Sequence, residues 1–214
     1  MPVAAVIPAY NEEKTVGNIL QLLKSISLID EIILVSDGST DNTAYIGRSY
    51  DVSVIELPQN RGKVGAVMCG VKSTNANVIL LLDADLVGLK KEHVYDLLLP
   101  VLKGESDMTI GVFKNGRGAT DLAQKIAPFL SGQRALQRWV FDKLKDYNVK
   151  DYGLEMALTI IAKKENLRVK TVVLNELTHV MKEEKRGFII GVASRIKMYW
   201  DILTCMLKLK LEVF

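Results

Sequence analysis

The stretch Val78-Ile79-Leu80-Leu81-Leu82-Asp83-Ala84-Asp85 decides the fold, because five apolar residues end abruptly in two carboxylates one residue apart. A continuous apolar run led by Val and Ile is typical of a strand that is buried on both faces. Burying an unpaired carboxylate is costly, so two carboxylates at the end of such a strand indicate a partner charge. Magnesium and manganese ions prefer oxygen ligands. Asp83 and Asp85 are therefore candidate ligands of a divalent cation.

Three more apolar segments precede this strand, and each is followed by a polar cluster and an expected helix. The strands are predicted at residues 2–7, 31–36 and 52–57, and the helices start near Glu12, within residues 40–43 and within residues 60–66. Strands that alternate with helices predict βαβ units and a largely parallel sheet. Ligands bind beyond the carboxyl ends of the strands in such sheets. The polar clusters all lie at those ends, so we expect a single α/β domain with its site there.

The same segments resemble the family-two glycosyltransferases of the GT-A fold. Four blocks occur in the order and at the spacing of that family: Ile7-Pro8-Ala9-Tyr10-Asn11-Glu12-Glu13, Val35-Ser36-Asp37-Gly38-Ser39-Thr40-Asp41-Asn42-Thr43, Asn60-Arg61-Gly62-Lys63-Val64-Gly65-Ala66 and Leu82-Asp83-Ala84-Asp85. The resemblance implies a sheet flanked by helices and a nucleotide-sugar donor, with a UDP-sugar favoured and GDP-mannose next. It also implies Mn²⁺ or Mg²⁺ as the cofactor.

The resemblance further implies a role for each block. The residues around the base and ribose would be Pro8, Ala9, Tyr10, Asn11, Glu12 and Asp37. Lys63 would lie near the ribose or phosphate, and Asp83, Ala84 and Asp85 would address the ribose and the metal–diphosphate. The competing dinucleotide-binding pattern requires glycines after the first strand, and residues 8–13 contain none.

The segment Ser131-Gly132-Gln133-Arg134 has two interpretations. With Ala135 it resembles the Ser-Gly-x-Arg-Ala segment of polyprenyl-phosphate glycosyltransferases, which implies that all four residues line the acceptor side. Ser131 is also a suitable N-cap for a helix that carries Leu136, Val140 and Leu144. Basic residues are concentrated in this part of the chain, which suits an anionic acceptor such as a lipid phosphate or another phosphorylated molecule: Lys114, Arg117, Lys125, Arg134 and Arg138.

Asp151 and Glu155 are the candidate catalytic residues. Tyr152-Gly153-Leu154-Glu155 resembles the acceptor-side motif of glucosyl- and mannosyl-3-phosphoglycerate synthases and of some lipid-linked sugar transferases. An inverting transfer needs a base that takes the proton of the acceptor hydroxyl, and either carboxylate suits that task. Glu155 is also expected in the first turn of a helix, where it would interact with the helix dipole. The family-two resemblance favours inversion, whereas the Tyr-Gly-x-Glu motif points to retaining relatives, so the stereochemical outcome stays open.

The two histidines have different expectations. His179 comes near the end of a strand expected from Val169, and several GT-A enzymes add a histidine on the C-terminal side as a further metal ligand. That resemblance makes His179 a candidate ligand beside Asp83 and Asp85, with a structural or surface role as the alternative. His93 is expected on the surface, at the start of a helix.

Length and composition suit one α/β domain of 214 residues. We expect a catalytic domain at 1–188, with a nucleotide-sugar half at 1–103 and an acceptor half at 104–188. Residues 189–214 are apolar but interrupted by charges, which predicts an amphipathic helical segment and excludes a transmembrane span. Such a segment packs on the domain, pairs two subunits in a homodimer, or lies on a membrane surface.

The charge and the cysteine content argue against nucleic-acid-binding, disulfide-rich and zinc-cluster proteins. The net charge is +3 with both signs mixed, so no footprint for nucleic acid is visible. Cys69 and Cys205 are too few for a disulfide framework or a zinc cluster. The first block begins within ten residues of Met1 and no signal peptide precedes it, so we expect a cytoplasmic protein, with the cytoplasmic membrane face as an option.

The sequence therefore predicts a metal-dependent glycosyltransferase. A sugar nucleotidyltransferase is the alternative enzyme, but it typically opens with a glycine-rich loop containing Arg and Lys, and the first loop here lacks one. A non-catalytic nucleotide-binding protein is the other alternative. It predicts missing carboxylates at the strand ends, whereas Asp37, Asp83 and Asp85 are all present.

Overall fold

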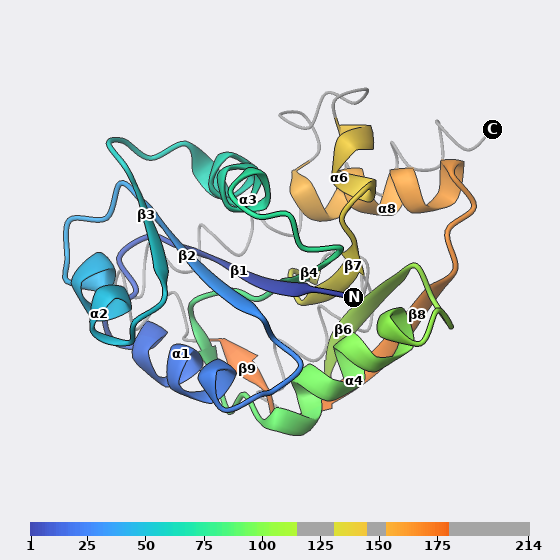
Figure 1. Cartoon of the computed structure of the whole chain (residues 1–214), viewed down its shortest axis with the longest axis horizontal. Helices are drawn as coiled ribbons and strands as arrows, with labels where there is room; N and C mark the ends of the chain where they lie inside the picture. The colour runs from blue at the N-terminus through green and yellow to red at the C-terminus, as the bar shows by residue number, and fades with distance from the viewer. Residues whose placement is uncertain (115–130, 145–152, 180–214) are drawn as a thin grey trace, which may run out of the picture. The chain divides into compact units, whose positions relative to one another are not determined.

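The computed structural model describes residues 1–114, 131–144 and 153–179, and its centre is a seven-stranded sheet (Figure 1). The strand order is β3-β2-β1-β4-β7-β6-β8. The strands are β1 (Val3–Ala9), β2 (Glu31–Asp37), β3 (Ser53–Leu57), β4 (Val78–Leu81), β6 (Met108–Lys114), β7 (Arg134–Gln137) and β8 (Val169–Asn175). All neighbours pair in parallel except β7, which is antiparallel to both β4 and β6. The predicted α/β class with a mostly parallel sheet is confirmed.

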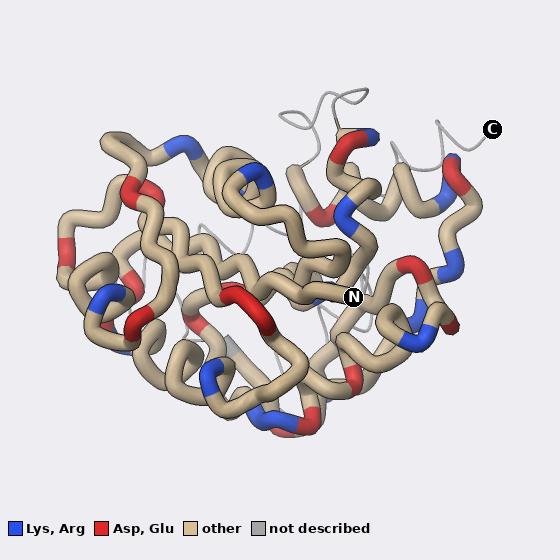
Figure 2. Tube along the Cα trace, in the orientation of Figure 1, with Lys and Arg blue, Asp and Glu red and all other residues tan. Residues whose placement is uncertain are grey.

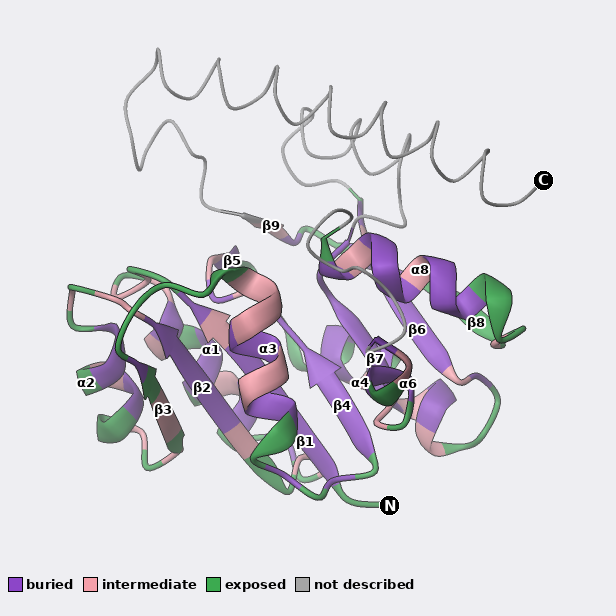
Figure 3. Cartoon of the chain, turned by 90° about the horizontal axis from the view of Figure 1, so that it is seen from above, coloured by how far each residue is buried: buried purple, intermediate pink, exposed green. Residues whose placement is uncertain are grey.

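Helices cover both faces of the sheet. Figure 1 shows α1 (Val16–Lys24), α2 (Thr43–Ser49) and α4 (Lys91–Leu102) on one face, with α3 (Gly62–Lys72), α6 (Val140–Lys143) and α8 (Leu154–Lys164) on the other. Two separate hydrophobic cores result, one on each face. Successive side chains of β1 alternate between them, and Figure 3 shows the central strands as mostly buried. Two covered faces explain why β1 and β4 are apolar at consecutive positions.

Three local expectations differ from the structure. The first helix begins at Val16, because Glu12 accepts backbone hydrogen bonds from Thr15 and Val16 in a turn that precedes it. The proposed helix after Ser131 is wrong: residues 134–137 form β7, which fills the position between β4 and β6, and the α-helix within the described residues 131–144 begins only at Val140. The surface placement of His93 is also wrong, because its side chain is only 5% exposed.

A small two-stranded sheet follows the Asp83-Ala84-Asp85 turn. It pairs β5 (Leu86–Val87) with β9 (Thr178–His179). The chain separates into two units, residues 1–178 and 179–214, and the second lies beyond the described residues except for the backbone of His179. The predicted boundaries at residues 103 and 188 stay predictions. None of the helices in the described ranges is long and apolar enough to cross a membrane.

Candidate functional site

Three loops at the carboxyl ends of β1, β2 and β4 are joined by side-chain hydrogen bonds. Asn11 adopts φ +57°, and its Oδ1 accepts the Thr40 backbone N–H at 2.8 Å. Thr43 Oγ1 accepts the Glu12 N–H at 2.8 Å, so the first loop is tied twice to the second. Thr15 Oγ1 donates to the Ala84 carbonyl at 2.7 Å and ties the first loop to the turn after β4. Three of the blocks predicted from the sequence therefore share one edge of the sheet.

Asp37 is held at the end of β2 by the loop that leads into α3. Its side chain is buried, and one carboxylate oxygen accepts the Arg61 backbone N–H at 2.7 Å. Gly38 follows with φ +68°, and a Cβ there would lie 2.6 Å from the backbone nitrogen of Asn60. Only glycine fits both the backbone angle and the close approach of the two loops. The Asp-Gly pair thus fixes the second and third blocks against each other.

An ionic cluster joins residues that are far apart in the sequence. Lys63, at the start of α3, places its Nζ 2.5 Å from Asp83 Oδ1 and 2.5 Å from Glu155 Oε1. Gln133 Nε2 donates to the other oxygen of Asp83 at 2.9 Å. The side chains of Lys63, Asp83 and Glu155 are 35%, 21% and 20% exposed, so the cluster is accessible but only partly solvated. We call Lys63, Asp83, Gln133 and Glu155 the Lys63 cluster.

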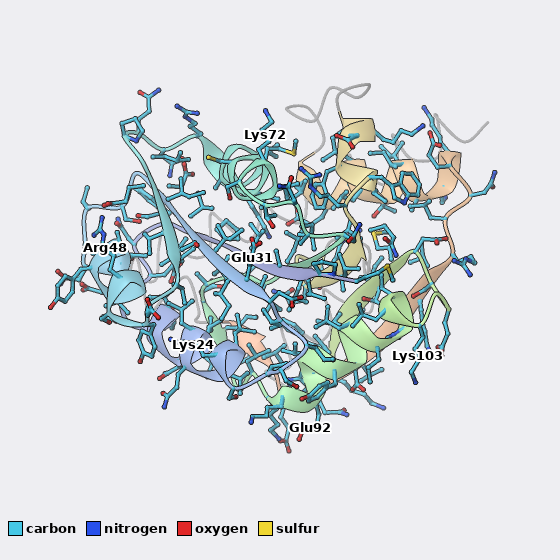
Figure 4. The ribbon with its side chains drawn as sticks, in the orientation of Figure 1. Lys24, Glu31, Arg48, Lys72, Glu92 and Lys103 are labelled. Carbon is cyan, nitrogen blue, oxygen red and sulfur yellow. The ribbon has the colours of Figure 1, made fainter. Side chains whose placement is uncertain are left out.

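The environment of Lys63 keeps its ammonium charged. Burial by itself would lower the pKa of Lys63, but the neighbouring carboxylates of Asp83 and Glu155 outweigh it and raise the pKa above its ordinary value. Other charged side chains lie away from the Lys63 cluster. Figure 4 shows the labelled Lys24, Arg48 and Glu92 at the periphery of the molecule, and Figure 2 shows charges of both signs interspersed along α4 and α8. The Lys63 cluster is thus a fixed cation between two anions at the edge where a ligand is expected.

The antiparallel direction of β7 brings the predicted acceptor segment to the same edge. Because Leu81 at the end of β4 pairs with Arg134 at the start of β7, the residues before Arg134 lie beside those after Leu81. Gly132 sits directly against the Lys63–Asp83 ion pair, where a Cβ would collide with Lys63 Nζ and with both oxygens of Asp83. Ser131 hydrogen-bonds Gln133 within this segment. Ser131 and Gly132 therefore border the Lys63 cluster, to which Gln133 belongs.

Arg134 is placed differently from the three residues before it. Its side chain is fully buried behind the cluster, with the guanidinium donating to the carbonyls of Ser131 and Glu155. Thr159, one turn after Glu155 on α8, also contacts this guanidinium. Thr159 belongs to none of the motifs in the sequence, and its one signal is its position four residues after a candidate acid.

The remaining candidates vary in their surroundings. Tyr10 is exposed, Pro8 and Glu12 are half-buried, and Ala9 and Ala84 are buried at the same edge. Asp151 and the side chain of His179 lie outside the described residues, so their roles stay predictions.

The carboxylate chemistry at this edge fits a hard divalent cation. Asp85 is half-buried in the turn two residues beyond Asp83, and both oxygens of Asp83 meet Lys63 or Gln133. Within the described ranges, no three His, Cys, Asp or Glu side chains gather closely enough to hold a metal. Magnesium is commonly held by one or two carboxylates, with waters and substrate phosphates as its other ligands. Asp83 and Asp85 are therefore the carboxylates at this edge that could contribute to such a site.

Known proteins resemble this chain in sequence and in structure. The model of the family described as glycosyl transferase family 2 matches residues 4–158. The 4,4'-diaponeurosporenoate glycosyltransferases of Staphylococcus aureus strains USA300 and NCTC 8325 are 36% identical over 98 residues. That alignment covers 44% of this chain and 26% of each relative, so it spans only about a quarter of their length.

Crystal structures of glucosyl-3-phosphoglycerate synthase from Mycobacterium tuberculosis share the fold. The complex with Mn²⁺ and UDP-glucose has a TM-score of 0.67 and 23% identity, covering 84% of this chain and 71% of that chain. The complex with phosphoglyceric acid has a TM-score of 0.66 and 23% identity, covering 84% and 72%. The fold is thus GT-A-like, as the sequence predicts. Since the family model matches well over half of its residues, the chain belongs to glycosyl transferase family 2.

Proposed function

We propose that the protein transfers a sugar from a nucleoside diphosphate sugar to a phosphorylated acceptor, with Mn²⁺ or Mg²⁺ as the cofactor. The observation that carries the proposal is the Lys63 cluster, which lies beside Asp85 at the carboxyl end of β4. Membership in glycosyl transferase family 2 supports the reaction class. UDP-glucose in the related crystal structure favours a UDP-sugar, with GDP-mannose as the second choice.

The donor's nucleoside is proposed to bind over the loops after β1 and β2. The buried carboxylate of Asp37 accepts a hydrogen bond from the base, because it lies at the end of β2 with one oxygen already held by Arg61. Tyr10 offers an exposed aromatic face beside it. Pro8, Ala9, Asn11 and Glu12 shape the rest of this subsite through the hydrogen bonds that fix the first loop.

Asp85 is proposed as the main ligand of the cation, with Asp83 and His179 as the other candidates from the sequence. A cation held there would supply positive charge that stabilises the negative charge of the diphosphate leaving group. Lys63 supplies a second, permanent positive charge next to Asp83, near the ribose or phosphate. Asp83 orients Lys63 through the ion pair and Gln133 through its amide.

Glu155 is proposed as the carboxylate that meets the acceptor hydroxyl. Its carboxylate lies in the Lys63 cluster and is 20% exposed, so a small acceptor can reach it from the open edge. Ser131 and Gly132 border the same cluster and, with Gln133, form the acceptor side of the site. Phosphoglyceric acid and glycerol 3-phosphate in related crystal structures favour a small phosphorylated acceptor over a lipid phosphate.

A ligand screen tests this function. Thermal unfolding is measured with UDP-glucose and with GDP-mannose, each with and without Mn²⁺, because a ligand that binds the native state raises Tm by mass action. UDP-glucose with Mn²⁺ should give the largest rise. Release of UDP is then measured with 3-phosphoglycerate, glycerol 3-phosphate and a short polyprenyl phosphate as acceptors. If neither nucleotide sugar changes Tm, the proposed donor class is rejected.

A further inference from the structure

Arg134 is a fully buried arginine whose donors reach two separate segments of the site. Its Nε donates to the Ser131 carbonyl at 2.9 Å. Its Nη2 donates to the Glu155 carbonyl at 3.1 Å and lies 3.3 Å from Thr159 Oγ1. The side chain has no exposed surface and starts from the first residue of β7. It therefore sits behind the site, between the turn at Ser131 and the first turn of α8.

These two segments carry groups of the Lys63 cluster. The Ser131 turn leads into Gly132, which touches the Lys63–Asp83 ion pair, and the first turn of α8 carries the Glu155 carboxylate. The Glu155 carbonyl accepts two hydrogen bonds, from Arg134 and from Thr159 Oγ1 at 2.8 Å. The main chain of Glu155 is thus fixed from two directions while its side chain points to Lys63.

The guanidinium shape suits this bridging task. Its planar fork donates in several fixed directions, so one side chain serves Ser131 on one edge and Glu155 on another. A lysine ammonium is a compact charge on a flexible stem and does not reproduce this fork. Burial lowers the pKa of Arg134 to about 10, and the nearby negative charge of Glu155 opposes that effect. Arg134 therefore keeps its charge at neutral pH.

We propose that Arg134 is a positioning residue that holds the main chain of Glu155 so that its carboxylate meets Lys63. The resemblance in the sequence instead implied that Arg134 lines the acceptor side, where its guanidinium would contact the acceptor phosphate. A phosphate contact requires the guanidinium to leave its buried hydrogen bonds to the Ser131 and Glu155 carbonyls, which costs the free energy of those bonds. The effect of Arg134 on sugar transfer rests on the proposed function, because it assumes that Glu155 acts on the acceptor; the contact between Glu155 and Lys63 does not.

The first test reads the Lys63–Glu155 contact without any activity. The side-chain ammonium signals of ¹⁵N-labelled protein are recorded, and the Lys63 signal is assigned with Lys63→Met. Glu155→Gln marks the position of that signal when the contact is broken. Arg134→Lys should move the Lys63 signal toward that position, whereas the matched control Arg168→Lys, at an exposed ion pair with Asp107, should not. An unmoved Lys63 signal in Arg134→Lys overturns the proposal, whether or not the protein transfers a sugar.

The second test is a double-mutant cycle on sugar transfer. Arg134→Lys should lower kcat by roughly 10- to 100-fold, the effect of a reacting group displaced by up to about 1 Å, while the acceptor KM changes by less than about twofold. In the Glu155→Gln background the same substitution should have little further effect. Equal losses in both backgrounds would show a general structural role. A raised acceptor KM with unchanged kcat would show a phosphate contact instead.

Thr159 provides a second route to the same contact if Arg134→Lys does not fold. Thr159→Val removes the hydroxyl that bonds the Glu155 carbonyl, and Thr159→Ser keeps it. Thr159→Val should move the Lys63 signal and lower kcat, and Thr159→Ser should restore both. A Thr159→Val protein that matches the wild type in both readouts counts against the proposal. A protein with no transfer to any acceptor rejects the proposed function alone, because the ammonium signal still reports the contact.

Discussion

Replacing Gly132 by alanine should impair the site while leaving the fold intact. A Cβ at this position would lie 2.6 Å from Asp83 Oδ2 and would also collide with Lys63 Nζ. Ordinary contacts of this kind begin at 3.4 Å, so the carboxylate oxygen has to retreat by about 0.8 Å. The Lys63 end is flexible and moves easily, so we expect a small change in the free energy of unfolding.

The expected loss lies in catalysis. A displacement close to 1 Å costs up to about 100-fold in rate when it affects a group that must be precisely placed, so Gly132→Ala should lower kcat by roughly 10- to 100-fold. UDP release from UDP-glucose with Mn²⁺ measures the rate, and thermal unfolding checks the fold. Gly17→Ala is the matched control, because the atoms nearest to its added Cβ belong to Tyr50 and Ile46, which are not part of the Lys63 cluster. Wild-type kcat in a folded Gly132→Ala protein would refute the idea that the Lys63 cluster must keep this geometry.

Three further predictions concern the metal site, the contact with the nucleobase and the pH dependence of stability. Asp85→Ala should abolish the Mn²⁺-dependent rise in Tm with UDP-glucose, while Asp96→Ala on the exposed face of α4 should retain it; an equal rise in both moves the metal elsewhere. Asp37→Asn keeps an acceptor for Arg61 and should weaken UDP binding by about 1–3 kcal/mol in titration calorimetry, and unchanged affinity argues against a contact with the base. Burial lowers the pKa of His93 below its ordinary 6.5, so the unfolded chain takes up the proton first. The contribution of His93 to the free energy of unfolding should be complete above pH 6.5 and should fall at lower pH. The urea midpoint of unfolding should therefore depend less on pH in His93→Gln than in the wild type, and an identical pH dependence in both proteins contradicts this prediction.

The sheet, and the strand ends where the donor is proposed to bind, were predictable because the sequence patterns that mark them are local. A strand buried on both faces needs consecutive apolar residues, and β4 has them; the polar residues that end β1, β2 and β4 are short-range features as well. Asp37 and Asp83 were therefore found at their strand ends from the sequence alone.

The residues whose placement was missed depend on contacts that are distant in the sequence. Residues 134–137 form a strand because β4 and β6 leave a position between them, and four residues carry no local sign of that. The burial of Arg134 follows from the same pairing and from α8, which supplies the Glu155 carbonyl and Thr159. His93 is buried because its imidazole accepts the Lys90 N–H and hydrogen-bonds the backbone of Asn175, at the end of a strand much later in the chain.

The antiparallel strand β7 also has a consequence for folding kinetics. The bond between Gln133 and Asp83 spans 50 residues, and Lys63 meets Glu155 over a still longer separation. Closing such loops is opposed by chain entropy, so long-range strand pairing is slow compared with the local helices. Gln133 directly precedes β7, so we expect the complete Lys63 cluster to form only when β7 has entered the sheet between β4 and β6. Recovery of a functional Lys63 cluster during refolding should therefore coincide with the slowest phase that completes the sheet, which makes the site a reporter of the finished fold.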